Sequence, residues 1–246
     1  MRVGAPVLRA RSAMTRRVAI TQSNYLPWKG YFDLIRSVDQ VVLYDEVQFT
    51  RRDWRNRNRI RTREGMAWLT VPVLVKGKYD QNIESTVVSD SGWAENHWRT
   101  ISHNYGRAPY FTEYSKQFQA FYENSPPENL SQINRHLIEI VLNILDISTQ
   151  LAWSHDFPID EVGKTERLVS ICLRAGATTY VSGPAAKDYL DVARFEQNGI
   201  SVEWFDYVGY PAYRQLHAPF IHEVSVIDLL LNMGPESLRF LERRSA

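Results

Sequence analysis

The stretch VAITQSNYLPWKGYFDLIRSVDQVVLYDEVQFTRRDWRNRN, residues 18–58, determines the fold that we predict for this chain. Its apolar runs at 18–20 and 41–44 have the length and composition of buried strands. Between them, Pro27 stiffens a turn by fixing φ, Gly30 permits a close backbone approach, and an apolar periodicity typical of a helix follows. Strand, loop, helix and strand together indicate a βαβ-like unit.

Polar side chains begin where these two strands end, at residues 22–24 after the first and at residues 45–48 after the second. Ligands of open α/β sheets bind outside the carboxyl ends of the strands, so we expect these loops to meet at one edge of the sheet. Trp28 and Tyr31 are expected to form the apolar wall of a pocket there, with packing in the core as the alternative for both. The polar residues predicted to line that pocket are Gln22, Asn24, Asp45, Asn56, Arg57 and Asn58, with Gln48 beside them.

Seven arginines lie in the thirteen residues from 51 to 63. From Arg55 onward they alternate with other residues, which in a strand puts them on one face. We expect either a guanidinium surface for phosphate or carboxylate, or a solvated edge strand protected by charge. Arg57 is favoured as a ligand residue because two asparagines bracket it. A second strand at 67–73 would complete a β-hairpin.

The remainder of the chain alternates further apolar runs with segments of helical periodicity. The further strands that we expect lie at 149–153, 178–181 and 200–205. With a helical insertion at about 91–147, these elements predict an α/β fold: a three-layer, Rossmann-like (nucleotidyltransferase-like) and largely parallel sheet with a β-hairpin. Residues 16–246 are expected to form a single domain, and residues 1–15 a flexible extension.

Composition and charge argue against several classes of partner. The chain has 246 residues, of which 44% are hydrophobic, enough to bury a large core. A formal net charge of +1 gives no reason to expect nucleic acid or a membrane as partner, and no apolar run reaches the roughly 20 residues of a membrane helix. The single cysteine, Cys172, and the lack of a secretory signal indicate a cytoplasmic protein. The histidines and Cys172 match no zinc pattern, so we expect neither metal nor cofactor, and the oligomeric state is left open.

Two residues are candidate general bases. Asp45 follows a strand at the expected pocket and is the first choice. His97 shares a helical face with Trp93, where a packed and hydrogen-bonded core histidine is the alternative. Ser182 and Gly183 form a tight junction between a strand and a helix, and the free amides of this junction would hold an anion at the helix start.

Several ordered motifs resemble the WbqC-like protein family over about residues 18–241. They are QSNYLPWKGYF, DEVQF, WRNRNRI, WLTVPV, W-x-x-x-H, YVSG and Y-x-Q. Through these motifs Tyr25, Tyr213 and Gln215 join the candidate ligand residues. The resemblance implies a bacterial protein of O-antigen or natural-product biosynthesis, acting as a glycine or other aminoacyl transferase to amino sugars.

The order of strand, proline-containing loop, glycine and helix also resembles nucleotidyltransferases that carry an H-x-G-H motif. In those enzymes the histidines stabilise the α-phosphate transition state. Trp28 and Tyr31 occupy the two histidine positions in this chain. The resemblance therefore implies that fold without that chemistry.

Three functions remain open. The first is acyl or aminoacyl transfer, or amide-forming condensation, onto an amine acceptor, by direct attack that needs positioning, an oxyanion donor and a general base. The second is an enzyme that binds a nucleotide or nucleotide sugar, and the third is a non-catalytic binding protein. Dependence on Mg²⁺ would separate the second from the first. In each case the expected ligand is a small anionic or amine-bearing molecule, either free, carrier-bound or nucleotide-linked.

Overall fold

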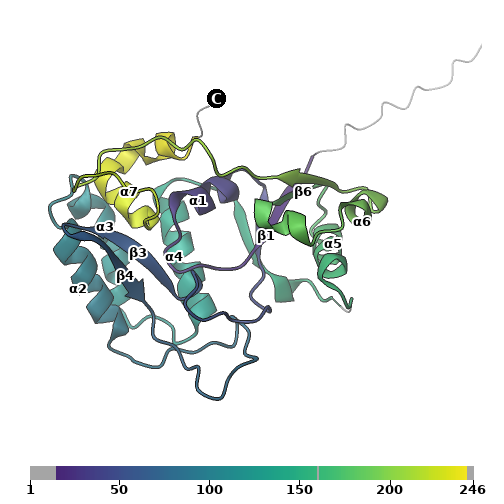
Figure 1. Ribbon diagram of the computed structural model, residues 1–246, viewed down its shortest axis with the longest axis horizontal. Coiled ribbons are helices and arrows are strands. Elements are labelled where there is room, and N and C mark those ends of the chain that lie inside the picture. The colour runs from purple at the N-terminus through teal and green to yellow at the C-terminus, as the bar shows by residue number, and fades with distance from the viewer. Residues whose placement is uncertain (1–14, 160, 243–246) are drawn as a thin grey trace, which may run out of the picture.

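The computed structural model describes residues 15–159 and 161–242 (Figure 1). Apart from Thr15, the expected extension at residues 1–15 lies outside the described residues. None of the helices in the described part of the chain is long and apolar enough to cross a membrane.

Five parallel strands form the main sheet, in the spatial order β5-β2-β1-β6-β7. They are β1 (Arg17–Thr21), β2 (Gln40–Leu43), β5 (Gln150–Trp153), β6 (Thr179–Ser182) and β7 (Ser201–Trp204). In the register, Ala19 of β1 lies beside Val41 of β2 and Val181 of β6. The prediction of an α/β fold with a largely parallel, Rossmann-like sheet is therefore confirmed.

The central strands are buried on both faces, and successive side chains alternate between two hydrophobic clusters. Ala19, Val41 and Val181 belong to one cluster. Their neighbours in sequence, Val18 and Val42, belong to the other. This alternation explains why the strands are short continuous apolar runs, as parallel sheets covered on both faces require.

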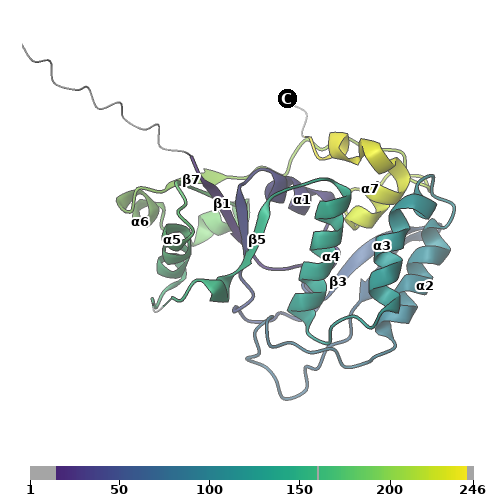
Figure 2. The ribbon, with the colours of Figure 1, turned by 180° about the vertical axis from the view of Figure 1, so that it is seen from behind.

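Helices cover both faces of the sheet and make three layers (Figures 1 and 2). The first cluster is shared with α1 (Lys29–Arg36) and α4 (Leu130–Ile144). The second is shared with α5 (Lys164–Arg174) and α6 (Val192–Gln197). Two short 3₁₀ segments, Ser154–Asp156 and Pro184–Asp188, follow β5 and β6, and a third, Gly234–Phe240, follows the last helix.

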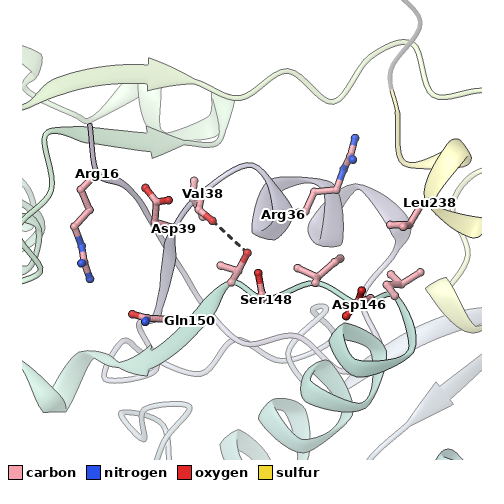
Figure 3. Close-up of a pocket in the computed structure, with 11 residues that line it drawn as sticks. Arg16, Arg36, Val38, Asp39, Asp146, Ser148, Gln150 and Leu238 are labelled. Carbon is pink, nitrogen blue, oxygen red and sulfur yellow. Dashed lines mark hydrogen bonds between the residues drawn. The ribbon is translucent and has the colours of Figure 1, made fainter. Parts of the chain in front are cut away.

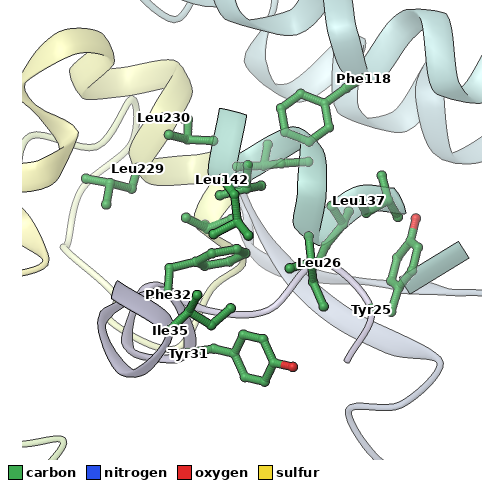
Figure 4. Close-up of a cluster of buried hydrophobic side chains, with 14 of the residues drawn as sticks. Tyr25, Leu26, Tyr31, Phe32, Ile35, Phe118, Leu137, Leu142, Leu229 and Leu230 are labelled. Carbon is green, nitrogen blue, oxygen red and sulfur yellow. The ribbon is translucent and has the colours of Figure 1, made fainter. Parts of the chain in front are cut away.

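Beyond α4, the first cluster continues into a helical and hairpin region. Its elements are the antiparallel pair β3 (Arg57–Thr62) and β4 (Gly65–Thr70), together with α2 (Trp93–Tyr105), α3 (Phe111–Glu123) and α7 (Val226–Met233). Figure 4 shows side chains of α1, α3, α4 and α7 meeting in this core, with Phe32 and Leu142 near its centre. The expected β-hairpin is thus present, and it lies apart from the main sheet.

The strand order reverses between β1 and β6, the first and fourth strands of the main sheet along the chain. In open α/β sheets this switch point leaves a crevice outside the carboxyl ends of the strands, where ligands bind. Residues Gln22 to Asn24 follow β1 there, and Gly183 follows β6. The fold therefore directs attention to the space between these two loops.

Candidate functional site

A cavity of about 710 Å³ lies at the switch point, within the range of about 300–1,000 Å³ that small-molecule sites occupy. It is bounded by the carboxyl ends of β1 and β6, the start of α1, the start of α5 and the loop before β3. We call it the switch-point cavity. Its polar or charged lining side chains include Gln22, Asn24, Arg55, Lys164 and Ser182, and its aromatic ones are Trp28, Tyr31, Tyr44, Trp54, Tyr180, Tyr189 and Tyr207.

Arg55 joins the loop before β3 to the end of β1. Its guanidinium donates hydrogen bonds to the side-chain oxygens of Asn24 and Gln22, the latter at 2.5 Å. Asp53 is an additional neighbour, with a 3.7 Å separation between its carboxylate and the guanidinium. The amide oxygens orient the guanidinium in the wall of the cavity, and the Asp53 carboxylate, which does not line the cavity, offsets part of its charge.

One turn of α4 fixes the backbone beneath this arrangement. Asn134 donates to the Ser23 hydroxyl at 3.0 Å and to the Arg55 carbonyl at 2.8 Å. Ser131 donates to the Asp45 carboxylate, which also accepts a 2.8 Å hydrogen bond from the Ser23 amide. A connected and buried hydrogen-bond network therefore holds three loops together: those after β1 and β2, and the loop before β3.

Aromatic side chains form the wall at the start of α1. The Trp28 indole lies 5.7 Å from the Tyr207 ring and 5.6 Å from the Tyr210 ring, measured between centroids. It covers Gly30 so closely that a Cβ there would lie 2.4 Å from the indole. Burial raises the pKa of Tyr207 to about 12, and burial together with the Asp45 charge raises the pKa of Tyr31 far above its usual value. Both phenols are consequently neutral hydrogen-bonding groups at physiological pH.

The opposite side is built by β6 and α5. Ser182 donates to the Tyr180 hydroxyl at 3.2 Å, and Gly183 lies beside the Tyr207 ring. Lys164, the first residue of α5, lies with its ammonium 5.9 Å from the Tyr189 ring centroid. Among the described residues that line the cavity none is acidic, whereas Arg55 and Lys164 are cationic. The site is thus electrostatically suited to an anion.

The two candidate bases do not line the switch-point cavity. Asp45 is 1% exposed, and its carboxylate is engaged by Ser23 and Ser131. His97 is buried between the Tyr25 hydroxyl, 2.7 Å from Nδ1, and the Thr70 carbonyl, 3.2 Å from Nε2. Burial lowers the pKa of His97 to about 4 despite the Thr70 carbonyl, so the ring is neutral and its nitrogens are occupied. The side chains of Asp45 and His97 therefore make structural hydrogen bonds, and neither faces the cavity.

Other predicted site residues separate into different places. Asn58 donates to the backbone carbonyl of Leu26 at 2.8 Å, and Asn56 donates to that of Val71 at 2.9 Å. Arg57 donates to the Arg52 carbonyl and covers the Trp68 ring at 4.1 Å from its centroid. Gln48 donates to the carbonyl of Tyr79, and Tyr25 is fully buried beside His97. Of the predicted set, the residues that share the cavity are Gln22, Asn24, Trp28, Tyr31, Ser182 and Gly183.

Tyr213 and Gln215 meet at a second, buried polar cluster around Asp228 of α7. Tyr213 donates to the Asp228 carboxylate at 2.7 Å and Gln215 donates to it at 2.9 Å. Burial raises the pKa of Asp228 although these donors oppose the shift. Nearby, Lys29 donates to the Pro211 carbonyl, and burial lowers its pKa to about 8. These contacts brace the aromatic loop before α7 against α1.

Sequence reasoning did not single out Arg55, Lys164 or Tyr207 as site residues. Arg55 lies in the loop before β3, as Arg51 and Arg52 also do, but of these three it is Arg55 that lines the switch-point cavity. Lys164 opens α5, whose first turn faces the carboxyl end of β6. No local pattern distinguishes Arg55 from Arg51 and Arg52, because the contacts of Arg55 with Gln22 and Asn24 depend on how the loop packs against the end of β1.

A separate cavity of about 590 Å³ lies at the amino ends of β1, β2 and β5. Figure 3 shows Arg16 at one end of its lining residues and Leu238 at the other, with Arg36 between them. Arg16 donates to Gln40, and Arg36 is paired with Asp33. Because parallel sheets bind ligands at the carboxyl edge, and this cavity lies at the amino edge, we place the functional site at the switch point. Within the described ranges, no group of three or more His, Cys, Asp or Glu side chains could hold a metal ion.

Comparison with known proteins gives two findings. The model of the WbqC-like protein family matches residues 22–240. The uncharacterized protein Rv1507c of Mycobacterium tuberculosis is 48% identical over 226 residues, which cover 92% of this chain and 97% of that protein. No solved structure matches the chain.

Proposed function

The chain belongs to the WbqC-like protein family, and from the geometry of its site we propose that it is a bacterial biosynthetic transferase. The switch-point cavity holds an anionic, phosphate-bearing donor, which is nucleotide-linked or carrier-linked. The observation that carries this proposal is the position of Arg55 and Lys164 in a cavity whose described lining has no acidic side chain. Arginine offers a planar fork that matches phosphate, and lysine adds a mobile point charge.

The aromatic lining supports a donor that contains a ring. Trp28, Tyr44 and Tyr207 present their rings to the cavity. Stacking of a base on an aromatic side chain is worth about 1–3 kcal/mol. The amides of Gln22 and Asn24 add hydrogen-bonding groups that select polar edges, although their oxygens already accept from Arg55. A nucleotide satisfies both the charge and the shape of this lining.

Acyl or aminoacyl transfer to an amine is the reaction that we assign to the site. The amine nitrogen bonds to the acyl carbon, the bond from that carbon to the donor oxygen or sulfur breaks, and the amine proton leaves with solvent or with the leaving group. Such a transfer needs no covalent enzyme intermediate, and the described cavity lining contains no cysteine. Cys172 is buried elsewhere, and burial raises its pKa to about 12. Catalysis then rests on positioning and on stabilisation of the oxyanion by cationic side chains.

On the resemblance of its motifs to the WbqC-like family, the proposal extends to a role in O-antigen or natural-product assembly. The alternative is a binding protein that holds a nucleotide or nucleotide sugar without turnover. Neither Asp45 nor His97 lines the cavity, which favours a mechanism in which the acceptor amine reaches the site already deprotonated.

The test is calorimetric titration of the full chain with nucleoside diphosphates, the matching nucleosides, phosphopantetheine and inorganic phosphate. We expect a phosphorylated, ring-bearing probe to bind and the matching nucleoside to bind at least about ten-fold more weakly, because the nucleoside forfeits the charge-assisted hydrogen bonds. Equal binding of nucleotide and nucleoside, or no binding of any phosphorylated probe, would contradict the proposal.

Transfer itself is tested by mass spectrometry of mixtures that contain an aminoacyl adenylate or an acyl thioester of phosphopantetheine and an amino sugar. Formation of an amide that depends on the protein supports a transferase. Tight nucleotide binding without amide formation from either donor would support the binding-protein alternative. The Arg63→Gln variant should form the amide as the unmodified chain does, because Arg63 is exposed in the hairpin turn.

A further inference from the structure

A smaller cavity of about 230 Å³ lies on the hairpin side of the switch-point cavity. Three residues, Asn24, Trp28 and Trp54, line both cavities and form the wall between them. The smaller cavity is completed by Pro27, Asn58, Arg59 and Glu223. We call it the hairpin-side cavity. Ligands in the two cavities would lie on opposite sides of this wall.

We propose that the hairpin-side cavity is a second ligand subsite, and that its occupant is a small zwitterion with an apolar or aromatic side chain. Its anionic group binds Arg59, its ammonium group binds Glu223, and its apolar body lies against Trp28, Trp54 and Pro27. The binding of this ligand does not depend on the transfer proposed above.

Arg59 is the first observation behind this inference. Its guanidinium lies 5.5 Å from the Trp54 ring centroid and 5.4 Å from that of Trp68. Among the described residues it has no hydrogen bond or ion pair through its side chain, and its Nε is buried without a partner. The indoles hold the guanidinium through cation–π contacts, which fix its position and leave its N–H donors available.

Glu223 is the second observation behind this inference. It lines the same cavity as Arg59 and is not paired with it or with another described cation. Opposite charges that share a small cavity without neutralising one another match a ligand with both charges, and Glu223 disfavours a multiply charged phosphate there. The apolar wall adds selection for a side chain larger than that of glycine, because burial of apolar surface contributes about 25 cal/mol per Å².

The backbone around the hairpin-side cavity is preorganised. The Ser225 amide donates to the Arg59 carbonyl at 2.8 Å, and the Val226 amide donates to the Pro27 carbonyl at 2.9 Å. The segment that carries Glu223 is thereby joined both to β3 and to the loop before α1. The two charges are consequently presented from elements that are fixed relative to one another, which reduces the cost of ordering them on binding.

The test uses calorimetric titration of the full chain with four probes at millimolar concentration. L-Phenylalanine has all three groups, L-phenylalaninamide lacks the carboxylate, 3-phenylpropanoate lacks the ammonium group, and glycine lacks the ring. We expect L-phenylalanine to bind most tightly and each of the others about ten-fold or more weakly. Four equal affinities, or no binding of L-phenylalanine, would overturn the proposal.

Two variants assign the groups. We expect Arg59→Gln to remove the preference for L-phenylalanine over L-phenylalaninamide. We expect Glu223→Gln to remove the preference for L-phenylalanine over 3-phenylpropanoate. Arg63→Gln and Glu64→Gln, at exposed positions of the hairpin turn, are the controls and keep both preferences. Unchanged preferences in the Arg59 and Glu223 variants would overturn the proposal.

Nucleotide titration of the same variants separates the two proposals. We expect Arg59→Gln to bind nucleoside diphosphates as the unmodified chain does, since Arg59 does not line the switch-point cavity. If nucleotides fail to bind and the probe preferences hold, the donor assignment falls and the zwitterion subsite stands.

Discussion

The Arg55 guanidinium donates a 2.5 Å hydrogen bond to the side-chain oxygen of Gln22, across a sequence separation of 33 residues. This contact joins the loop before the hairpin to the end of the first strand of the sheet. It places a guanidinium at the point where the strand order reverses. The candidate site is therefore produced by the meeting of two segments that belong to different parts of the fold.

Exchange of Arg55 for lysine or glutamine separates charge from geometry. We expect Arg55→Gln to weaken binding of a nucleoside diphosphate by about ten- to hundred-fold, because one charge-assisted hydrogen bond is worth about 1.5–3 kcal/mol. Arg55→Lys should recover part of that loss, since lysine keeps the charge without the planar fork. Calorimetric titration measures both, and equal affinities in all three proteins would contradict an anion site at Arg55.

Substitution of Asp45 tests whether this carboxylate braces the loops. Asp45→Asn should lower the free energy of unfolding by about 1.5–3 kcal/mol, because the hydrogen bonds from Ser23 and Ser131 lose a charged acceptor. Urea denaturation gives the value. Ser131→Ala is the partner variant, and the double variant should show coupling of at least about 0.5 kcal/mol between the two sites. Unchanged stability together with a transfer rate reduced by about a hundred-fold or more would instead identify Asp45 as a base.

The contact between Gly30 and Trp28 links the wall of both cavities to α1. A Cβ at residue 30 would lie 2.4 Å from the Trp28 indole, so Gly30→Ala should displace the ring and weaken binding of nucleotide and zwitterion probes together. Gly92→Ala is the matched control, because a Cβ there meets its nearest atom, of Asp90, at 3.5 Å. Tryptophan fluorescence during titration reports the displacement. Undiminished affinity for both ligands in Gly30→Ala would show that the wall tolerates the shift.

The neutral His97 predicts a specific acid sensitivity. Its folded-state pKa of about 4 lies below the ordinary value of 6.5, so the unfolded chain binds the additional proton between these pH values. The contribution to stability is complete above pH 6.5 and is lost as the pH falls toward 4, which amounts to about 2 kcal/mol at about pH 5. Urea denaturation of the unmodified chain and of His97→Gln at about pH 7 and pH 5 isolates the contribution of His97 to the free energy of unfolding. We expect the loss on acidification to be smaller in the variant by that amount, and identical losses would contradict a buried neutral ring.

The main sheet could be predicted from local pattern alone. Its five strands are short apolar runs, and the side chains of Val18 and Ala19 or of Val41 and Val42 enter opposite clusters because strand residues alternate with a period of two. That periodicity belongs to the chain itself and needs no knowledge of distant partners. It also placed Gln22, Asn24, Ser182 and Gly183 at the carboxyl ends of strands, where the structure has the cavity.

Only the tertiary structure decided which of these polar residues act together. Arg55 and Arg57 are alike in sequence, yet Arg55 lies before β3 and reaches the cavity, while Arg57 lies in the strand and covers Trp68. Asp45 has the sequence position of a site residue, but Ser131, 86 residues away, occupies its carboxylate. A local sequence pattern fixes the direction of a side chain relative to its own strand or helix. The partner that a side chain meets depends on how distant elements pack. In this protein α4 supplies the partner of Asp45, and the loop before β3 supplies that of Gln22.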